Sequence, residues 1–296
     1  MEQLLGRNAV VTGGGQGIGR GIALALAEAG MRVAVLDIEA DAAERTAREL
    51  ATLGVRSLGL AVDVTSERSL ADAAAVVAEA LGPVHVLSNN AGVSAPQGKI
   101  ADKTDADWQW VFSVNLFGIV KSVQAFLPGM RAHREGGHVV NTSSMAGLIA
   151  VPELEVGVYT ASKYACTAYC EILRAELAPE GIGVSVLCPG LIDTNLSATS
   201  ARNRPSTFGG PLAVPPPMPE EMRRVAMRPE DVGPIVVRGI RANRLHILTH
   251  PEMSIPMVEA RFRQIRQDAE GELADRSGAA PATPRQEPDP RWPRGA

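Results

Sequence analysis

The sequence predicts an α/β protein built on a doubly wound parallel sheet. Six short runs rich in Val, Leu and Ala recur along the first two thirds of the chain, with segments of helical length between them. The runs are nearly continuous in apolar residues, which is typical of strands that helices cover on both faces. A glycine-rich turn directly follows the first run. Together these observations favour a Rossmann-type sheet in one domain.

The expected strands and helices alternate along the chain. Strands are predicted at 8–12, 32–36, 57–61, 84–88, 138–141 and 183–188, with a last strand at 245–249. Helices are predicted at 17–29, 40–53, 66–81, about 105–133 and 158–179. Gly30 and Gly54 lie where helices should end, and Pro179 ends another.

We expect residues 1–275 to form a single domain. Proline and glycine accumulate between 195 and 228, which indicates a loop-rich insertion beside the substrate site, and a helix at 229–243 follows it. Residues 250–275 predict a polar C-terminal helix. Residues 277–296 are rich in Pro, Ala and Arg, so we expect a disordered tail.

Composition and charge exclude several classes of function. A formal net charge of −4 and a pI near 5.8 give no basic surface for nucleic acid or an anionic membrane. No run approaches eighteen apolar residues and the N-terminus leads straight into a strand, so we expect a cytoplasmic protein without a membrane partner. Cys166, Cys170 and Cys188 form no Cys-x-x-Cys pair, and we predict neither disulfides nor a metal site.

The glycine-rich turn after the first strand is a candidate phosphate site. Gly13, Gly17 and Gly19 allow a tight turn and a close approach of the backbone to a pyrophosphate, and the next helix offers unpaired N–H groups. Gln16 and Ile18 lie in the same turn and are candidate cofactor contacts. The spacing departs from the G-x-G-x-x-G pattern of dinucleotide binders, so a glycine-rich loop without a ligand is the alternative.

Acidic residues after the second and third strands are candidate contacts to a nucleoside. Asp37 can accept hydrogen bonds from ribose hydroxyls and repel a 2′-phosphate, which favours NAD over NADP. Ile38 and Gln16 stand where a basic residue would be expected for NADP. Asp63, with Val64 beside it, could bind the adenine amino group. Both carboxylates could instead cap helices.

Polar residues also follow the fourth strand. Asn89-Asn-Ala-Gly92 would lie at the carboxyl edge of the sheet, where ligands bind in open α/β folds. Asn90, Ala91 and Gly92 are therefore candidate cofactor contacts. The alternative is a turn stabilised by asparagine side chains.

Tyr159 and Lys163 are the candidate catalytic pair. Their spacing of four residues places both side chains on one face of a helix. An ammonium group favours a phenolate over a phenol and lowers the tyrosine pKa, which produces a base suited to an alcohol substrate. An ordinary amphipathic helix is the alternative, because isolated Tyr-x-x-x-Lys matches are common.

The order of these motifs resembles the short-chain dehydrogenase/reductase family over about residues 6–196. The resemblance is carried by Thr12-Gly-x-x-x-Gly-x-Gly19, Asn89-Asn-Ala-Gly92, Ser143-Ser144, Tyr159-x-x-x-Lys163 and Pro189-Gly190. It implies a single Rossmann-type domain, a nicotinamide cofactor and hydride exchange between a secondary alcohol and a ketone.

The resemblance also implies a role for each matching residue. Tyr159 would be the general acid/base, and Lys163 would lower its pKa and bind the nicotinamide ribose. Ser144 would hydrogen-bond the substrate oxygen, with Ser143 as the competing residue. Asn115 would hold a water molecule that links Lys163 to solvent.

The segment after the sixth strand would orient the nicotinamide. By the same resemblance, the Pro189-Gly190 turn, the backbone near Ile192 and the Thr194 hydroxyl would hold the carboxamide. A plain helix N-cap is the alternative for Thr194.

Two features depart from the family pattern. Ser144 and Tyr159 are fifteen residues apart, about two more than is usual in the family, and the extra loop at 152–155 either lines the substrate site or is a neutral insertion. The chain also lacks the usual glycine-rich ending, which weakens the expectation of a tetramer built through the C-terminus. We expect a homodimer or homotetramer.

We predict an NAD-dependent dehydrogenase acting on a bulky hydrophobic or aromatic secondary alcohol. Residues 202–210 and 245–252 resemble bacterial relatives that oxidise benzylic alcohols derived from lignin. His246 and His250 could contact substrate, although surface or packing roles are the more ordinary interpretation. The alternatives are an NADPH-dependent ketone or 3-oxoacyl reductase, and an inactive dinucleotide-binding regulatory protein.

Overall fold

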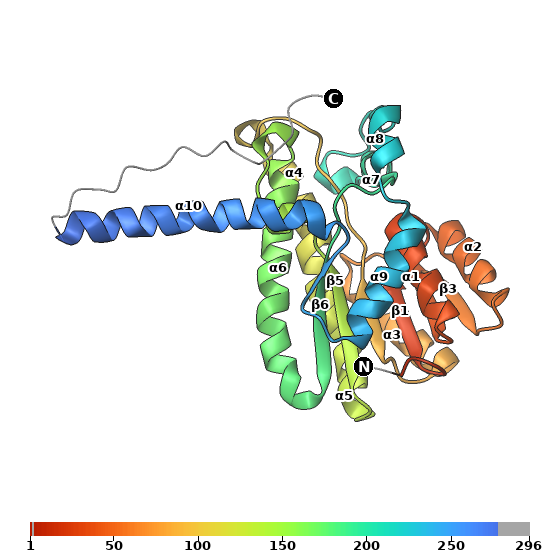
Figure 1. Ribbon diagram of the computed structural model, residues 1–296. Helices are drawn as coiled ribbons and strands as arrows, with labels where there is room; N and C mark the ends of the chain where they lie inside the picture. The colour runs from red at the N-terminus through yellow and green to blue at the C-terminus, as the bar shows by residue number, and fades with distance from the viewer. Residues whose placement is uncertain (2, 278–296) are drawn as a thin grey trace.

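The computed structural model describes residues 1 and 3–277. Its centre is a parallel seven-stranded sheet with the strand order β3-β2-β1-β4-β5-β6-β7 (Figure 1). The strands are β1 Asn8–Thr12, β2 Arg32–Asp37, β3 Ser57–Ala61, β4 Val86–Asn89, β5 Gly137–Thr142, β6 Ile182–Cys188 and β7 His246–Leu248. The order reverses between β1 and β4, which opens a crevice at the carboxyl ends of these strands.

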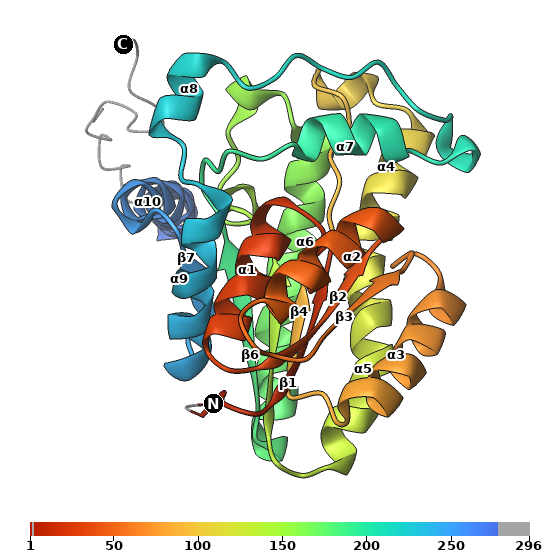
Figure 2. The same ribbon diagram turned by 90° about the vertical axis from the view of Figure 1, so that its right-hand side faces the viewer.

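Helices cover both faces of the sheet, as Figures 1 and 2 show. One face carries α1 Gly17–Glu28, α2 Ala40–Ala51 and α9 Pro229–Arg241. The other carries α3 Glu67–Leu81, α4 Asp105–Phe112, α5 Ile119–Ala132 and α6 Gly157–Leu177. The inner strands β1, β2, β4, β5 and β6 therefore bury both of their faces, which explains their nearly continuous apolar sequences, whereas the edge strands β3 and β7 are only partly buried. The predicted fold class is confirmed.

Two helical predictions need correction. The expected helix at 105–133 is interrupted by a π-helical turn, Ser113–Gly118, which separates α4 from α5. The insertion at 195–228 contains two short helices that the sequence did not predict, α7 Leu196–Asn203 and α8 Glu220–Val225. Short 3-10 turns complete the chain at Ile100–Asp102, Met145–Gly147, Pro152–Leu154, Ala178–Glu180 and Ser206–Phe208.

Within the described part of the chain, one helical stretch is long and apolar enough to cross a membrane. It is Asp105–Ala132, and half of its most apolar window is buried within the fold. Trp110, Val111 and Phe126 of this stretch belong to the core beneath the sheet. The same apolar character is thus used in packing.

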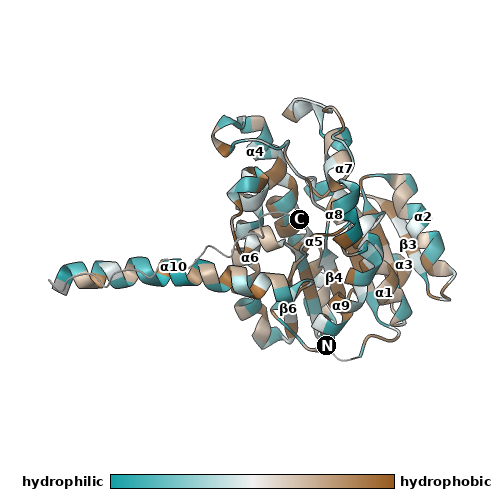
Figure 3. Ribbon diagram, turned by 45° about the horizontal axis from the view of Figure 1, so that its top comes forward, coloured by the Kyte–Doolittle hydropathy of each residue, from teal (hydrophilic) through white to brown (hydrophobic). Residues whose placement is uncertain are grey.

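The last helix, α10 Pro251–Ser277, extends away from the sheet (Figures 1 and 3). The expected C-terminal helix at 250–275 corresponds to it. The expected disordered tail lies outside the described residues from position 278 onward.

His138 on β5 is a buried imidazole. Its Nε2 lies 2.8 Å from Ser185 Oγ, and Ser185 donates its own proton to the Arg244 carbonyl, so His138 is the donor. Its Nδ1 is buried and has no hydrogen-bond partner among the described residues. Burial lowers the pKa of His138 to about 3, and the nearby positive charges of Arg174 and the N-terminus act in the same direction.

The lowered pKa of His138 predicts a loss of stability in mild acid. The unfolded chain takes up a proton below its ordinary pKa of about 6.5, whereas the folded chain does not, so the free energy of unfolding falls by about 2 kcal/mol between pH 7 and pH 5. Urea unfolding at both pH values measures this. In the variant His138→Gln the free energy of unfolding should depend much less on pH. A small dependence should remain, because burial also lowers the pKa of His85. An equal fall in the free energy of unfolding between pH 7 and pH 5 in the wild type and in His138→Gln would contradict the role given to His138.

Candidate active site

A cavity of about 680 Å³ opens at the carboxyl edge of the sheet, where the strand order reverses. It runs from the glycine-rich turn and Asp37 to Tyr159 and onward to the α7 and α8 region. Its volume lies within the usual range of about 300–1,000 Å³ for small-molecule sites. Most residues predicted from the sequence to bind cofactor line this one cavity.

The glycine-rich turn packs tightly against the end of β4. Gly13 has φ +61°, and a Cβ there would lie 2.7 Å from the Ala91 backbone. A Cβ on Gly19 would overlap the Gly13 carbonyl. Asn90 donates from Nδ2 to that carbonyl, and the Asn90 and Ala91 N–H groups bond to Thr12 Oγ1. Glycine at 13 and 19 is therefore required by close packing within the protein.

Other residues of the turn face the cavity. Gln16, Gly17 and Ile18 line it at the start of α1. Gly17 has φ +54°, and the nearest atoms to a Cβ placed there belong to Thr194, at 3.6 Å. The N–H groups in the first turn of α1 lack helical partners and can receive a phosphate.

Asp37 lies in the cavity wall and also fixes the glycine-rich turn. Its Oδ2 accepts from the Gly15 N–H at 2.9 Å and its Oδ1 from the Glu39 N–H at 3.1 Å. Burial raises the pKa of Asp37, while the backbone hydrogen bonds from Glu39 and Gly15 act in the opposite direction. Each carboxylate oxygen retains capacity for one more donor, such as a ribose hydroxyl.

Asp63 and Val64 form the neighbouring part of the wall. Asp63 Oδ1 accepts from both the N–H and the Oγ1 of Thr65, at 2.8 and 2.7 Å. Asp63 thus stabilises the turn before α3. It does not cap this helix, because Ser66 is the N-cap and its side chain accepts from the Ser69 N–H.

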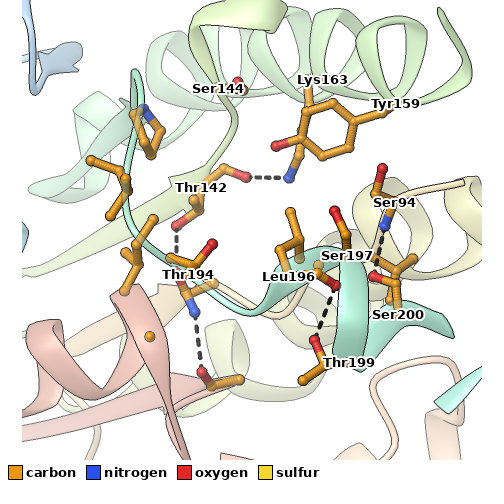
Figure 4. Close-up of a pocket in the computed structure, with 18 of the residues that line it drawn as sticks. Ser94, Thr142, Ser144, Tyr159, Lys163, Thr194, Leu196, Ser197, Thr199 and Ser200 are labelled. Carbon is orange, nitrogen blue, oxygen red and sulfur yellow. Dashed lines mark hydrogen bonds between the residues drawn. The ribbon is translucent and has the colours of Figure 1, made fainter. Parts of the chain in front are cut away.

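Tyr159 and Lys163 lie on the first turns of α6 and face the cavity (Figure 4). Lys163 is only 2% exposed, and its Nζ donates to the Thr142 carbonyl at the end of β5, at 2.8 Å. The same Nζ lies 5.4 Å from the centre of the Tyr159 ring. The predicted pair is thus close in space, with the ammonium held in place by the sheet.

The two adjacent serines have different surroundings. Ser143 is buried and donates to the Lys163 carbonyl, and its Oγ also lies 2.9 Å from Thr167 Oγ1. Ser144 is less buried, and its Oγ accepts from the Ala146 N–H, which leaves its hydroxyl proton available to another acceptor. Figure 4 places Ser144 beside Tyr159 and Lys163. This geometry favours Ser144 over Ser143 as the residue that contacts substrate.

Asn115 lies in the π-helical turn and is fully buried. Its side chain bonds to both the N–H and the carbonyl of Val93, and Nδ2 also donates to Ser162 Oγ. A Cβ on Gly92 would lie 3.4 Å from Asn115 Oδ1 and 3.5 Å from Lys163 Nζ. Asn115 and Lys163 therefore converge on Gly92. Both N–H bonds of the Asn115 amide are already used, so only its Oδ1 or main chain could hold the expected water.

The segment after β6 borders the cavity opposite the glycine-rich turn. Pro189, Gly190, Ile192 and Thr194 all line it. The Gly190 N–H bonds to Thr249 Oγ1 at 2.9 Å, and a Cβ on Gly190 would lie 2.6 Å from the His250 ring. Thr194 does not cap α7, because Asn195 is the residue before that helix.

The outer end of the cavity is lined by flexible apolar side chains. The methionines come from three separate regions, namely the 3-10 turn after β5, the segment at and before α8, and the start of α10: Met145, Met218, Met222, Met253 and Met257. The loop at 152–155 adds Leu154 between Val151 and Val156, so this insertion does line the site. Methionine adapts its shape and makes favourable contacts with aromatic rings.

A buried ion pair holds the insertion over the cavity. Arg204, which follows α7, binds Asp107 of α4 at 2.6 Å and lies 5.5 Å from the centre of the Trp110 ring. Burial opposes ionisation of Asp107, but hydrogen bonds from Thr104 and Arg204 outweigh it and lower its pKa. On α7, Ser200 accepts from the Ser94 N–H. The sequence analysis identified none of these contacts.

The two histidines considered as substrate contacts have other surroundings. His246 lies on β7 with its Nε2 3.5 Å from Glu171. His250 packs under Gly190, and its Nδ1 lies 2.7 Å from Thr249 Oγ1. Neither belongs to the cavity lining.

A group of possible metal ligands lies away from the cavity. Donor atoms of His85, His133 and Glu135 come within 4.8 Å of one another. Each imidazole nitrogen of the two histidines already has a protein partner. His85 contacts the Asn8 N–H and the Glu135 carboxylate. His133 contacts the Val84 carbonyl and the Glu135 N–H. The hydrogen bonds account for this cluster without an ion.

Comparison with known proteins agrees with this geometry. The family model described as short chain dehydrogenase matches residues 7–205. The CLA biosynthesis dehydrogenase/reductase of Lactiplantibacillus plantarum is 30% identical over 270 residues, which cover 87% of this chain and 92% of that protein. The C alpha-dehydrogenase of Sphingobium sp. is 32% identical over 263 residues, which cover 86% and 83% of the two chains.

A solved structure is also similar over nearly the whole chain. The short chain dehydrogenase/reductase of Burkholderia phymatum in complex with NAD has a TM-score of 0.79 and 31% identity, and the match covers 97% of this chain and all of that one. This chain belongs to the short-chain dehydrogenase/reductase family of oxidoreductases, which bind NAD(P) and act on CH–OH groups.

Proposed function

We propose that this protein oxidises a bulky, uncharged aromatic secondary alcohol with NAD. The observation that carries the proposal is that Tyr159, Lys163 and Ser144 share one cavity with the glycine-rich turn and with the methionine-lined outer lobe. A nicotinamide cofactor supplies the hydride acceptor when it is bound. The protein supplies the base, the orientation and the apolar surroundings.

In this proposal Tyr159 accepts the hydroxyl proton as hydride leaves the carbinol carbon. Lys163 stabilises negative charge on the phenolic oxygen and binds the ribose next to the nicotinamide. Because Lys163 is anchored to the Thr142 carbonyl, its ammonium loses little freedom when it acts. Ser144 donates a hydrogen bond to the substrate oxygen. Asn115 holds, through its Oδ1 or its main chain, a water molecule that links Lys163 to solvent.

The proposed cofactor contacts follow the cavity wall. Phosphates bind at Gly13 and Gly17, with Gln16 and Ile18 beside them. Gly19, also predicted as a contact, is not among the lining residues and packs against the Gly13 carbonyl. Asp37 accepts from the adenosine ribose. The other contacts are Asp63, Val64, Asn90, Ala91, Gly92, Pro189, Gly190, Ile192 and Thr194. The preference for NAD rests on the Asp37 carboxylate and on the neighbouring apolar Ile38.

The proposed substrate class rests on the side chains of the outer lobe, which is the methionine-lined outer end of the cavity. Met222 of α8 and Met257 of α10 face the cavity together with Leu154 and Trp110. Arg204, which lies against the Trp110 ring, is already neutralised by Asp107, and Lys163 is the one Lys or Arg among the lining residues. An aromatic alcohol fits these surroundings better than a carboxylate or phosphate ester. The name of the similar C alpha-dehydrogenase is consistent with oxidation at a carbon beside a larger group.

We further infer that residues 1–275 act as one domain in a cytoplasmic enzyme. We expect a homodimer or homotetramer with no nucleic-acid or membrane partner. Ile172 on the outer face of α6 is 63% exposed, which supports the use of this helix between subunits.

Replacement of the phenol tests the proposed base. Tyr159→Phe removes the proton acceptor but keeps the ring, so turnover should fall at least about 10³-fold while NADH binding stays within a few-fold. Steady-state rates and NADH fluorescence titration measure the two quantities. Ser143→Ala is a control at a neighbouring position, and it should lose far less turnover. Full activity in Tyr159→Phe would remove the phenol from the mechanism.

A panel of alcohols tests the substrate and cofactor. The kcat/KM for 1-aryl-1-propanols with NAD should exceed that for 2-propanol by at least about tenfold, because burial of an aromatic ring contributes well over 1.4 kcal/mol. NAD should be preferred to NADP, and Asp37→Ala should reduce this preference. Preference for NADPH with 3-oxoacyl thioesters would support the reductase alternative instead. Absence of turnover with every substrate while NADH still binds would support the regulatory alternative.

A further inference from the structure

The C-terminal helix α10 projects from the body of the protein (Figures 1 and 3). Its first turns are anchored, since Met257 is buried and the guanidinium of Arg261 lies 4.9 Å from the centre of the Tyr164 ring. From Arg261 to Glu270 every residue is exposed. A rise of about 1.5 Å per residue makes the projecting part, residues 261–277, about 25 Å long. A solitary helix of this length is only marginally stable in water.

An apolar stripe follows one side of this helix. It contains four exposed large side chains, with Val258 and Ala269 in the same register: Ile255, Phe262, Ile265 and Leu273. The spacings of three and four residues place them on one helix face. Phe262 is 56% exposed and Leu273 64%. Such a seam is typical of a helix that packs against another helix.

The charges on the projecting part are segregated along its length. The charges of the first half are all arginines, whereas the second half has four carboxylates and one arginine: Arg261, Arg263 and Arg266, then Asp268, Glu270, Glu272, Asp275 and Arg276. The second half is therefore net acidic, although Arg276 pairs with Glu272. A helix by itself is stabilised by acidic groups near its N-terminus and basic groups near its C-terminus. The terminal turns of α10 carry charges in this favourable order, Glu252 in the first turn and Arg276 in the last. The charges between Arg261 and Asp275 lie outside these turns, so the helix dipole does not explain their segregation.

We propose that α10 pairs in antiparallel orientation with α10 of a second copy of this chain. A two-fold axis across the helix then brings each arginine-rich half opposite the acidic half of its partner and joins the two apolar seams. In the antiparallel pair the two helix dipoles point in opposite directions, which is a favourable arrangement. Parallel pairing would instead place like charges side by side. The contact is smaller than a standard interface of about 800 Å² per partner, so micromolar association is expected from this helix alone.

Sedimentation velocity of the full chain between about 1 and 100 µM tests the pairing. Phe262→Glu places a charge in the seam and should weaken self-association at least tenfold. Gln267→Glu adds the same charge to another exposed face of the same helix and should leave association within about twofold. Circular dichroism and thermal unfolding establish that both variants fold. Equal association of wild type and Phe262→Glu, or a monomeric wild type throughout this range, would overturn the proposal.

Charge inversion tests the arrangement of the two copies. Arg263→Glu/Arg266→Glu makes the projecting part acidic, and Glu270→Arg/Glu272→Arg makes it basic, so each variant alone should associate at least tenfold more weakly than wild type. An equimolar mixture should recover association as a mixed oligomer. A mixture that associates no better than its components overturns the pairing. Binding of wild type, but not Phe262→Glu, to phosphatidylcholine vesicles without any difference in self-association would assign the helix to a lipid surface instead.

Discussion

The hydrogen bond from Lys163 Nζ to the Thr142 carbonyl joins the catalytic helix to the end of strand β5. It holds a buried ammonium close to the Tyr159 ring, and no carboxylate among the described residues pairs with it. Burial of an unneutralised charge is costly unless its donors are used, and one of the three ammonium donors is used here. The remaining donors suit a ribose hydroxyl and a phenolate. The constraint on Lys163 therefore prepares the site for its proposed partners.

The rest of the fold supports this arrangement through close packing at the carboxyl edge of the sheet. Asn90 ties the glycine-rich turn to β4, and Asn115 ties the π-helical turn to Val93 and to Ser162 of α6. Ser143 bonds to the backbone of α6 at Lys163, next to the free hydroxyl of Ser144. Three strand ends and one helix are thus held in a fixed relation, which is how proximity and orientation contribute to catalysis.

The sequence predicts the central fold well because buried parallel strands need continuous apolar runs and because helices must alternate with them. It also locates the residues of the candidate site, since their motifs lie at successive strand ends. The π-helical turn at Asn115 leaves no local signal, and the Arg204–Asp107 pair joins residues that are far apart in the sequence. The methionines of the outer lobe come from separate elements, so sequence spacing gives no indication of their meeting. The direction of α10 depends on tertiary packing at its base, and this packing likewise joins residues that are far apart in the sequence.

A crystal structure of the complex with NAD tests the central claim most directly. The account predicts a pyrophosphate at the Gly13–Gly19 turn, Lys163 Nζ within hydrogen-bond distance of the nicotinamide ribose, and Tyr159 Oη facing the space above the nicotinamide ring. Lys163 should keep its bond to the Thr142 carbonyl. A dinucleotide bound with its nicotinamide away from Tyr159 and Lys163 would contradict the account.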